Sequence, residues 1–283
     1  LHYFGIFLHA NICAGRAMAS LVTFGETSAV FVARDIGRMR YCRDFTVRPG
    51  GAEATVAVGV HRLGFDTAWI SALGEDEMGH YLRGLVAAEG VDVSRVSMVA
   101  GKPTAIFLRE RLPGGDARHF YYRKNSAFAG YRPDMLDEAF IASAKILHLT
   151  GINPALSPSC DAAAWRAVEI ARANGVTVSF DPNVRLALWG REEARGTLER
   201  YMAAADIVFP GLEDMQMLYG RVDPGQALSI LRGLGCGRIV MKAGEGDVHV
   251  VEGDCTRTLA VDAVATPVDL MGAGDAFAAG CLA

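Results

Sequence analysis

The sequence has few of the features that mark membrane, nucleic-acid-binding, disulfide-rich or metal proteins. No run of about 18 uninterrupted apolar residues occurs, so no spanning helix is expected. The net charge of −4 provides no basic surface, so no nucleic-acid partner is expected either. The six cysteines form no CxxC pair, and the seven histidines form no ligand or triad pattern. We therefore expect reduced thiols, a cytoplasmic protein and no metal held by protein ligands alone.

The composition that remains is typical of a folded enzyme. A hydrophobic content of 51% with 21% charged residues argues against disorder. A chain of 283 residues can bury a large core, and its length suits one large α/β domain or two small ones.

Both ends of the chain look irregular. We expect residues 1–18 to be a non-native or disordered extension, because Met18 lies where a natural start would, just before the first strand-like run. A signal peptide is the competing interpretation, but the segment lacks a basic start, and His9 and Asn11 interrupt its apolar run. The chain stops at Ala283 inside a predicted helix, so we also expect a C-terminal truncation.

Strand-like and amphipathic stretches alternate from residue 67 onward. This alternation predicts a mostly parallel sheet with helices on both faces and an active site beyond the carboxyl ends of the strands. The predicted strands are 67–73, 146–150, 176–180, 207–209 and 238–242. The predicted helices are 78–88, 157–173, 192–204, 213–219 and 225–234.

Two regions, 27–48 and 103–124, break this alternation. Both contain β-rich runs without intervening helices. Because they precede or interrupt the α/β core, we interpret them as a small separate sheet that forms a lid over the active site. An extra hairpin of the main sheet is the alternative.

The most informative segment is a glycine turn that runs into the apolar helical stretch 276–280. Gly272 and Gly274 let backbone N–H groups approach an anion, and the positive end of the following helix points at the same place. With Ala273 they would stabilise charge on a transferred phosphoryl group, while the Asp275 carboxylate takes a proton from the attacking hydroxyl. The alternative is an ordinary helix-start turn with an acidic first-turn residue.

A second glycine turn, Gly50-Gly51, also precedes a helix and allows a ligand to approach backbone N–H groups closely. The segments 50–64 (GGAEATVAVGVHRLG) and 269–280 (DLMGAGDAFAAG) resemble the two signatures of the ribokinase-like, or PfkB, carbohydrate kinases. The resemblance covers essentially all of residues 20–283. It implies an α/β fold, a ribokinase-like three-layer sandwich with a mostly parallel central sheet and a small β-sheet lid, in a kinase domain over 19–283.

Further segments resemble a subgroup of that family, the 2-keto-3-deoxygluconate kinases. They are 25–27 (GET), 120–127 (FYYRKNSA), 150–157 (TGINPALS) and 181–189 (DPNVRLALW). The resemblance implies phosphorylation of the terminal primary hydroxyl of a sugar acid with ATP and Mg²⁺. A kinase for a neutral sugar such as fructose or ribose, or a catalytically weak sugar- or nucleotide-binding protein, are the alternatives.

The resemblance also implies roles for single residues, with Asp275 as the base and Gly272 to Gly274 as the anion hole. Arginine suits an acidic substrate because a guanidinium grips a carboxylate with two parallel hydrogen bonds. The implied substrate-binding residues are Gly50, Gly51, Tyr121, Arg123 and Arg185. The alternative is that the two arginines are structural and that Tyr121 only packs in the lid. The implied nucleotide-binding residues are Asn183, Lys242, Gly244 and Gly246.

Four departures from the family pattern qualify these roles. Thr55 stands where the family usually has Asn, and Leu270-Met271 replaces the usual Thr-Thr before the anion hole. Phe107 occupies a lid position where the closest kinases have Tyr. The Asn-x-x-Glu motif linked to magnesium is represented only by residues 211–214 (GLED). We expect Mg²⁺ to arrive with ATP, a small-molecule sugar or sugar acid as the partner, and a homodimer if two lids pair through their exposed edges.

Overall fold

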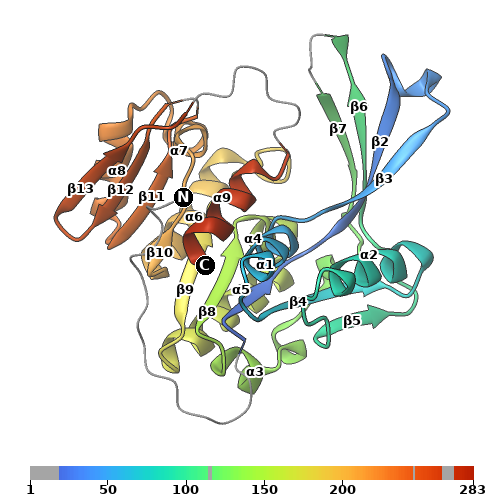
Figure 1. Ribbon diagram of the computed structural model, residues 1–283, viewed down its shortest axis with the longest axis horizontal. Helices are drawn as coiled ribbons and strands as arrows, with labels where there is room; N and C mark the ends of the chain where they lie inside the picture. The colour runs from blue at the N-terminus through green and yellow to red at the C-terminus, as the bar shows by residue number, and fades with distance from the viewer. Residues whose placement is uncertain (1–18, 114–116, 245, 263–270) are drawn as a thin grey trace.

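The computed structural model describes residues 19–113, 117–244, 246–262 and 271–283 (Figure 1). Within these ranges the centre of the molecule is a nine-stranded sheet in the order β13-β12-β11-β10-β9-β8-β1-β4-β5. The pairs from β5 to β11 are parallel, and β11, β12 and β13 pair antiparallel at one edge. The strands are β1 (Leu21–Phe24), β4 (Thr67–Gly74), β5 (Val96–Val99), β8 (Ile146–Thr150), β9 (Thr177–Asp181), β10 (Ile207–Val208), β11 (Arg238–Lys242), β12 (Val248–Glu252) and β13 (Cys255–Leu259).

Helices cover both faces of this sheet, because successive residues of a strand point to opposite sides. Leu21 of β1 and Ile146 of β8 pack against the side that carries α1 (Ala52–Arg62) and α9 (Ala273–Leu282). Their neighbours Val22 and Leu147 pack on the opposite side. That second side carries α5 (Pro158–Ala173), α6 (Arg191–Ala204), α7 (Leu212–Tyr219) and α8 (Pro224–Gly233). The predicted three-layer α/β sandwich is confirmed.

The remaining helices are short or lie at one end of the sheet. Helix α2 (Glu77–Ala88) packs on β4 and on the first lid strand. Its N-terminus is fixed by Asp76, whose carboxylate accepts a hydrogen bond from the Gly79 N–H at 2.8 Å. The short helices are α3 (Glu138–Ala142), α4 (Ile152–Leu156), η1 (Met39–Tyr41), η3 (Phe128–Gly130) and η4 (Pro133–Met135). Among the described helices, none is both long and apolar enough to cross a membrane.

A second sheet stands out from the body as a long arm (Figure 1). It has the order β3-β2-β6-β7, with antiparallel β2–β3 and β6–β7 pairs joined by a parallel β2–β6 pair. The two β-rich regions therefore form a separate sheet, and the alternative of an extra hairpin in the main sheet is wrong. Its strands are β2 (Ser28–Ile36), β3 (Phe45–Gly50), β6 (Ile106–Arg111) and β7 (Ala117–Tyr122). We refer to these four strands as the lid sheet.

The five strands and five helices predicted from the alternation agree with the structure to within two residues at either end. The antiparallel hairpin of β12 and β13 and the edge strand β5 were not predicted. All eight residues of β4 and all five of β8 are buried, as is typical of parallel strands covered on both faces. Strand order reverses between β1 and β8, so the fold predicts a ligand at the carboxyl ends of these two strands.

The contact between α1 and α9 gives a test of the packing. A Cβ atom on Gly59 of α1 would lie 2.6 Å from the Cβ of Ala279 on α9, closer than such atoms pack. We expect Gly59→Ala to lower the free energy of unfolding by about 1–3 kcal/mol, because overpacking outweighs the gain of about 1 kcal/mol in helix propensity. Gly84→Ala is the matched control, since residue 84 of α2 has open space around it.

Urea denaturation of both variants measures the difference. Gly84→Ala should be as stable as the unmodified protein or slightly more stable. If Gly59→Ala behaved like Gly84→Ala, α1 and α9 would not be packed as closely as the structure shows.

Candidate active site

The predicted anion hole is the N-terminus of α9. Gly272 is the residue before the helix and has φ 80° and ψ 0°, a left-handed conformation that glycine adopts without strain. The Ala276 N–H donates to the Gly272 carbonyl at 2.8 Å, which closes the first turn. The turn therefore directs the following N–H groups and the positive end of the helix toward one place, where Asp275 also lies.

A buried ion pair stands beside this helix end. The Lys242 ammonium, at the end of β11, donates to Asp181 Oδ2 at 2.9 Å, at the end of β9. The same Nζ atom lies 3.5 Å from the position that a Cβ of Gly274 would take. Lys242 was predicted on the nucleotide side, and the structure places its charge directly against the anion hole. From the sequence, Asp181 was given no role beyond its place in the segment 181–189. Its position as an acid at the end of a buried strand is a signal that could have identified it.

Asp275 has the electrostatic surroundings of a general base. Burial and the nearby Asp181 carboxylate raise its pKa to about 6, against the opposing effects of Lys242 and Arg185. At neutral pH the carboxylate is therefore ionised but more basic than an ordinary aspartate. A base acts best when its pKa lies near the working pH, so these surroundings suit proton removal from a hydroxyl.

The segment 211–214 has a positioning role that the sequence did not predict. Asp214 Oδ1 accepts a hydrogen bond from the Val184 N–H at 2.8 Å, and Oδ2 accepts one from the Gly211 N–H at 3.0 Å. Burial and the Asp181 carboxylate raise the Asp214 pKa to about 6. Both oxygen atoms are thus used to attach the loop after β9 to the start of α7, and that loop carries Asn183 and Arg185.

The acidic groups fit a metal ion that arrives with a nucleotide. Within the described ranges, no group of three or more His, Cys, Asp or Glu residues could hold a metal ion. Asp181 is engaged by Lys242 and by the Asn183 N–H, at 2.9 Å each, and Asp214 by two backbone N–H groups. Mg²⁺ usually keeps several waters and is held by substrate phosphates with only one or two carboxylates. Acids that are already engaged within the protein therefore fit a metal ion that is bound mainly by the phosphates of the nucleotide.

The other predicted nucleotide-binding residues surround the same strand ends. Asn183 has a φ of 39°, which turns the chain directly after β9. Gly244, with φ 70°, and Gly246 lie in the turn between β11 and β12, next to Lys242. Strand ends and turns from three parts of the chain therefore meet at the N-terminus of α9.

On the predicted sugar side, the turn Gly50-Gly51 lies where the lid sheet joins the body. Gly50 ends β3, and a Cβ there would lie 2.9 Å from the Phe107 ring and would overlap Val30. Gly51 directly precedes α1, and a Cβ there would overlap Thr27 and the Glu26 carbonyl. Neither position has room for a side chain, which explains both glycines without a substrate.

Arg123 is engaged by an acid that sequence reasoning gave no role. Its Nη2 lies 2.6 Å from Glu26 Oε2 and its Nε donates to the same oxygen at 2.7 Å. The Glu26 side chain is 1% exposed, and the Ser126 hydroxyl donates to its other oxygen. The guanidinium also lies 5.8 Å from the centre of the Tyr121 ring. Arg123 is therefore near the predicted pocket, but its charge is neutralised within the protein.

Arg185 is the predicted arginine that faces the base. Its Nη1 donates to the Val184 carbonyl at 2.8 Å, and its charge lowers the pKa values of both Asp275 and His119 of β7. It is thus close enough to both residues for its charge to act on them. The charges of Lys242 and Arg185 both act on Asp275, whereas Arg123 is paired with Glu26.

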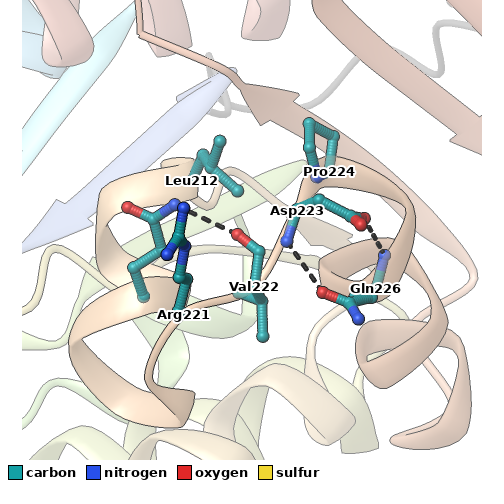
Figure 2. A pocket seen from close by; sticks show the side chains of 7 residues that line it. Leu212, Arg221, Val222, Asp223, Pro224 and Gln226 are labelled. Atoms are coloured by element: carbon teal, nitrogen blue, oxygen red, sulfur yellow. Dashed lines mark hydrogen bonds between the residues drawn. The ribbon is translucent and has the colours of Figure 1, made fainter.

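A groove between α7 and α8 contains none of the predicted site residues (Figure 2). Several of its polar groups have partners within the helix ends. The Asp223 N–H donates to Gln226 Oε1 at 3.0 Å, and the Gln226 N–H donates to Asp223 Oδ1 at 2.8 Å. This reciprocal cap at the start of α8 explains Asp223 and Gln226 in the groove without a ligand.

Comparisons with known proteins agree with this geometry. The family described as pfkB family carbohydrate kinase matches residues 18–283. A 2-dehydro-3-deoxygluconokinase of Bacillus subtilis (strain 168) is 35% identical over 263 residues, which cover 92% of this chain and 81% of the relative. A probable fructokinase-4 of Arabidopsis thaliana is 34% identical over 272 residues, 91% of this chain and 79% of the relative.

Solved structures show the same fold. A PfkB protein from Polaromonas sp. JS666 has a TM-score of 0.85 at 36% identity, covering 93% of this chain and 87% of that one. A putative ribokinase II from E. coli in complex with ATP and Mg²⁺ has a TM-score of 0.83 at 26% identity, covering 93% and 84%. The chain belongs to the pfkB family of carbohydrate kinases. It is a sugar kinase, and its relatives include kinases named for both a sugar acid and a neutral sugar.

Glu53 is a buried acid at the point where strand order reverses. It is the second residue of α1 and is 1% exposed, and the Thr150 hydroxyl at the end of β8 donates to its Oε1 at 2.7 Å. Its Oε2 has no hydrogen-bond partner among the described residues. The carboxyl group fills the space where Gly25, after β1, would carry a side chain. Burial, with a smaller contribution from Asp275, raises the Glu53 pKa to about 7.

This raised pKa makes stability depend on pH. Between its ordinary pKa of 4.5 and about 7, the folded protein keeps the Glu53 proton while the unfolded chain releases it. The stabilisation is present below pH 4.5 and is lost as pH rises through about 7, by up to about 3 kcal/mol. Glu53→Gln keeps the shape of the neutral acid and cannot ionise.

We expect the free energy of unfolding to fall more between pH 5 and pH 8 in the unmodified protein than in Glu53→Gln, measured by urea denaturation. Glu193→Gln, on the exposed side of α6, controls for the loss of one carboxylate. Parallel pH profiles for Glu53→Gln and the unmodified protein would show that Glu53 is ionised in the folded state.

Proposed function

We propose that this sugar kinase phosphorylates the terminal primary hydroxyl of a sugar acid, with 2-keto-3-deoxygluconate (2-dehydro-3-deoxygluconate) as the first candidate. The observation that carries the proposal is the position of Arg185 on the loop after β9. Asp181 and Asp214 hold this loop through the N–H groups of Asn183 and Val184, and the charge of Arg185 acts on both Asp275 and the lid residue His119. An acid group bound there would hold the far end of a substrate whose hydroxyl lies at the base. The similarity to a 2-dehydro-3-deoxygluconokinase supports the same substrate.

The residues of the anion hole have separable roles in the proposed reaction. ATP supplies the phosphoryl group, and its Mg²⁺ supplies charge that balances the phosphates. Asp275 takes the proton from the attacking hydroxyl as the bond to phosphorus forms. The N–H groups from Gly272 to Gly274 and the Lys242 ammonium stabilise the charge that develops on the transferred group.

The nucleotide and sugar occupy opposite sides of this centre in the proposal. Asn183 and the turn with Gly244 and Gly246 bind the nucleotide. Backbone groups at Gly50 and Gly51 bind sugar hydroxyls, and Tyr121 is directed over them from the lid sheet. Arg123, whose charge is balanced by Glu26, contributes hydrogen bonds and no net charge.

One observation favours a neutral sugar as the second candidate. Because Glu26 neutralises Arg123, the predicted pair of positive charges is reduced to Arg185 at this place. The fructokinase relative at 34% identity points the same way. Both candidates use the same base and anion hole, and they differ in what the lid side of the pocket contacts.

A catalytically weak binding protein finds less support. The Thr55 hydroxyl donates to the Gly51 carbonyl at 2.8 Å, so it does not replace the usual amide at the sugar site. Leu270 lies outside the described residues, as does the extension 1–18. The left-handed turn at Gly272 and the raised pKa of Asp275 nevertheless support the proposed anion hole and base. The homodimer stays a prediction, for which β3 and β7 are the outer strands of the lid sheet.

Asp275→Asn tests the base. The amide keeps the shape of the side chain but cannot accept the proton, so we expect turnover to fall by about 10²–10⁴-fold with binding of sugar and ATP largely kept. ADP release measures turnover, and calorimetry measures binding. Asp254→Asn, in the exposed turn between β12 and β13, is the control. Near-normal ADP release by Asp275→Asn would remove Asp275 from this role.

Replacing Arg185 and Arg123 one at a time distinguishes a role in substrate binding from a role in fold stability. We expect Arg185→Gln to raise the KM for 2-keto-3-deoxygluconate by about 10- to 100-fold and the KM for fructose much less. Arg123→Gln should instead destabilise the fold by about 3–5 kcal/mol, since it leaves the buried Glu26 charge unpaired. Steady-state kinetics and urea denaturation distinguish the two. Equal KM changes for both sugars in Arg185→Gln would contradict binding of an acid group.

A further inference from the structure

His119 lies on the face of the lid sheet that carries Tyr121, and it has no role in the proposed reaction. In the β6–β7 pair, Arg109 lies opposite His119 and Phe107 lies opposite Tyr121. Side chains two residues apart on a strand share a face, so these four are neighbours on one side of the sheet. The rings confirm this, because His119 lies 5.7 Å from Phe107 and 6.2 Å from Tyr121.

This face is turned toward the sugar side of the site. Phe107 touches the position of Gly50, and Tyr121 lies under the Arg123 guanidinium. His119 is one step further out along β7, and it is exposed. Its side chain is therefore available to a ligand that lies between the lid sheet and the loop carrying Arg185.

Positive charge surrounds His119 in the free protein. Burial on one side is the largest effect that lowers the pKa of His119. The charges of Arg109 on β6 and Arg185 on the loop after β9 lower it further. Among the described residues, Tyr121 of the same strand is a further ionisable group beside it. The ring is therefore neutral at pH 7, and an anion placed between it and Arg185 would reverse the balance and favour a proton on the ring.

We propose that His119 is a specificity-determining residue that binds the acid group of the substrate together with Arg185, and that it takes up a proton from solvent when an acidic sugar binds. This inference rests on the proposed function, since it requires a sugar acid in the pocket. It follows from the Glu26–Arg123 pair. With Arg123 neutralised, a protonated His119 adds to the positive charge of Arg185 and Arg109 where the carboxylate would bind.

The first experiment counts protons, and it does not depend on turnover. Calorimetric titration of the unmodified protein with 2-keto-3-deoxygluconate at pH 7, in buffers of different ionisation enthalpy, should show uptake of up to about one proton per site. Fructose should cause no uptake. His119→Gln, which keeps a polar side chain but cannot be protonated, should abolish uptake and weaken binding of the acid by about tenfold.

Arg118→Gln is the matched control, because residue 118 is the neighbour of His119 on β7 and its side chain lies on the opposite face. It should leave both proton uptake and affinity unchanged. Thermal unfolding confirms that both variants are folded. In kinetics, His119→Gln should raise the KM for the acid and flatten its rise with pH, with kcat and the fructose KM kept.

The outcomes separate this inference from the proposed function. Turnover of 2-keto-3-deoxygluconate with the same proton uptake in His119→Gln, or equal losses for acid and neutral sugars, would overturn the role of His119 and leave the sugar-acid kinase standing. Turnover of fructose alone by the unmodified protein, with no binding of the acid, would overturn both.

Discussion

The ion pair of Lys242 and Asp181 is the interaction on which the site depends. It joins the ends of β9 and β11 and places an ammonium group against the start of α9. Without that charge, Asp181, Asp214 and Asp275 would repel one another across a partly buried space, and the pKa of Asp275 would rise further. The pair therefore favours an ionised Asp275 carboxylate next to the proposed phosphate site.

A second buried pair connects the body to the lid sheet. Glu26 follows β1 of the central sheet, and Arg123 follows β7 of the lid sheet, so their contact ties the two sheets together at the mouth of the pocket. Burying both charges costs free energy that the pair recovers only through good geometry, here two hydrogen bonds to Glu26 and an ion-pair contact at 2.6 Å. Such a pair suits a fixed orientation of the lid base more than a gain in stability.

Much of the fold was predictable because its signals are local. Alternating strands and helices gave the parallel sheet, and the runs of β6 and β7 stood out because no helix separates them. The antiparallel edge of β12 and β13 was missed, since all five residues of β13 are exposed and its sequence lacks an apolar pattern. In the site, motif spacing identified Asp275 and the glycine turns. It could not show that Glu26 neutralises Arg123, or that Asp214 holds a loop, because these contacts join residues 97 and 30 positions apart.

The groups proposed for phosphoryl transfer and those proposed for substrate recognition come from different parts of the fold. This difference explains why the substrate is harder to assign than the reaction. Asp275, Lys242 and the anion hole come from strand ends and a helix end, which the main core holds rigidly. The groups that would distinguish an acid from a neutral sugar lie on the lid sheet and on one loop, where a single side chain changes the net charge. A sugar-acid kinase relative and a fructokinase relative can thus stand at 35% and 34% identity to the same chain. In the proposed site, specificity is accordingly a matter of a few charges on the lid side, where Glu26 offsets the charge of Arg123.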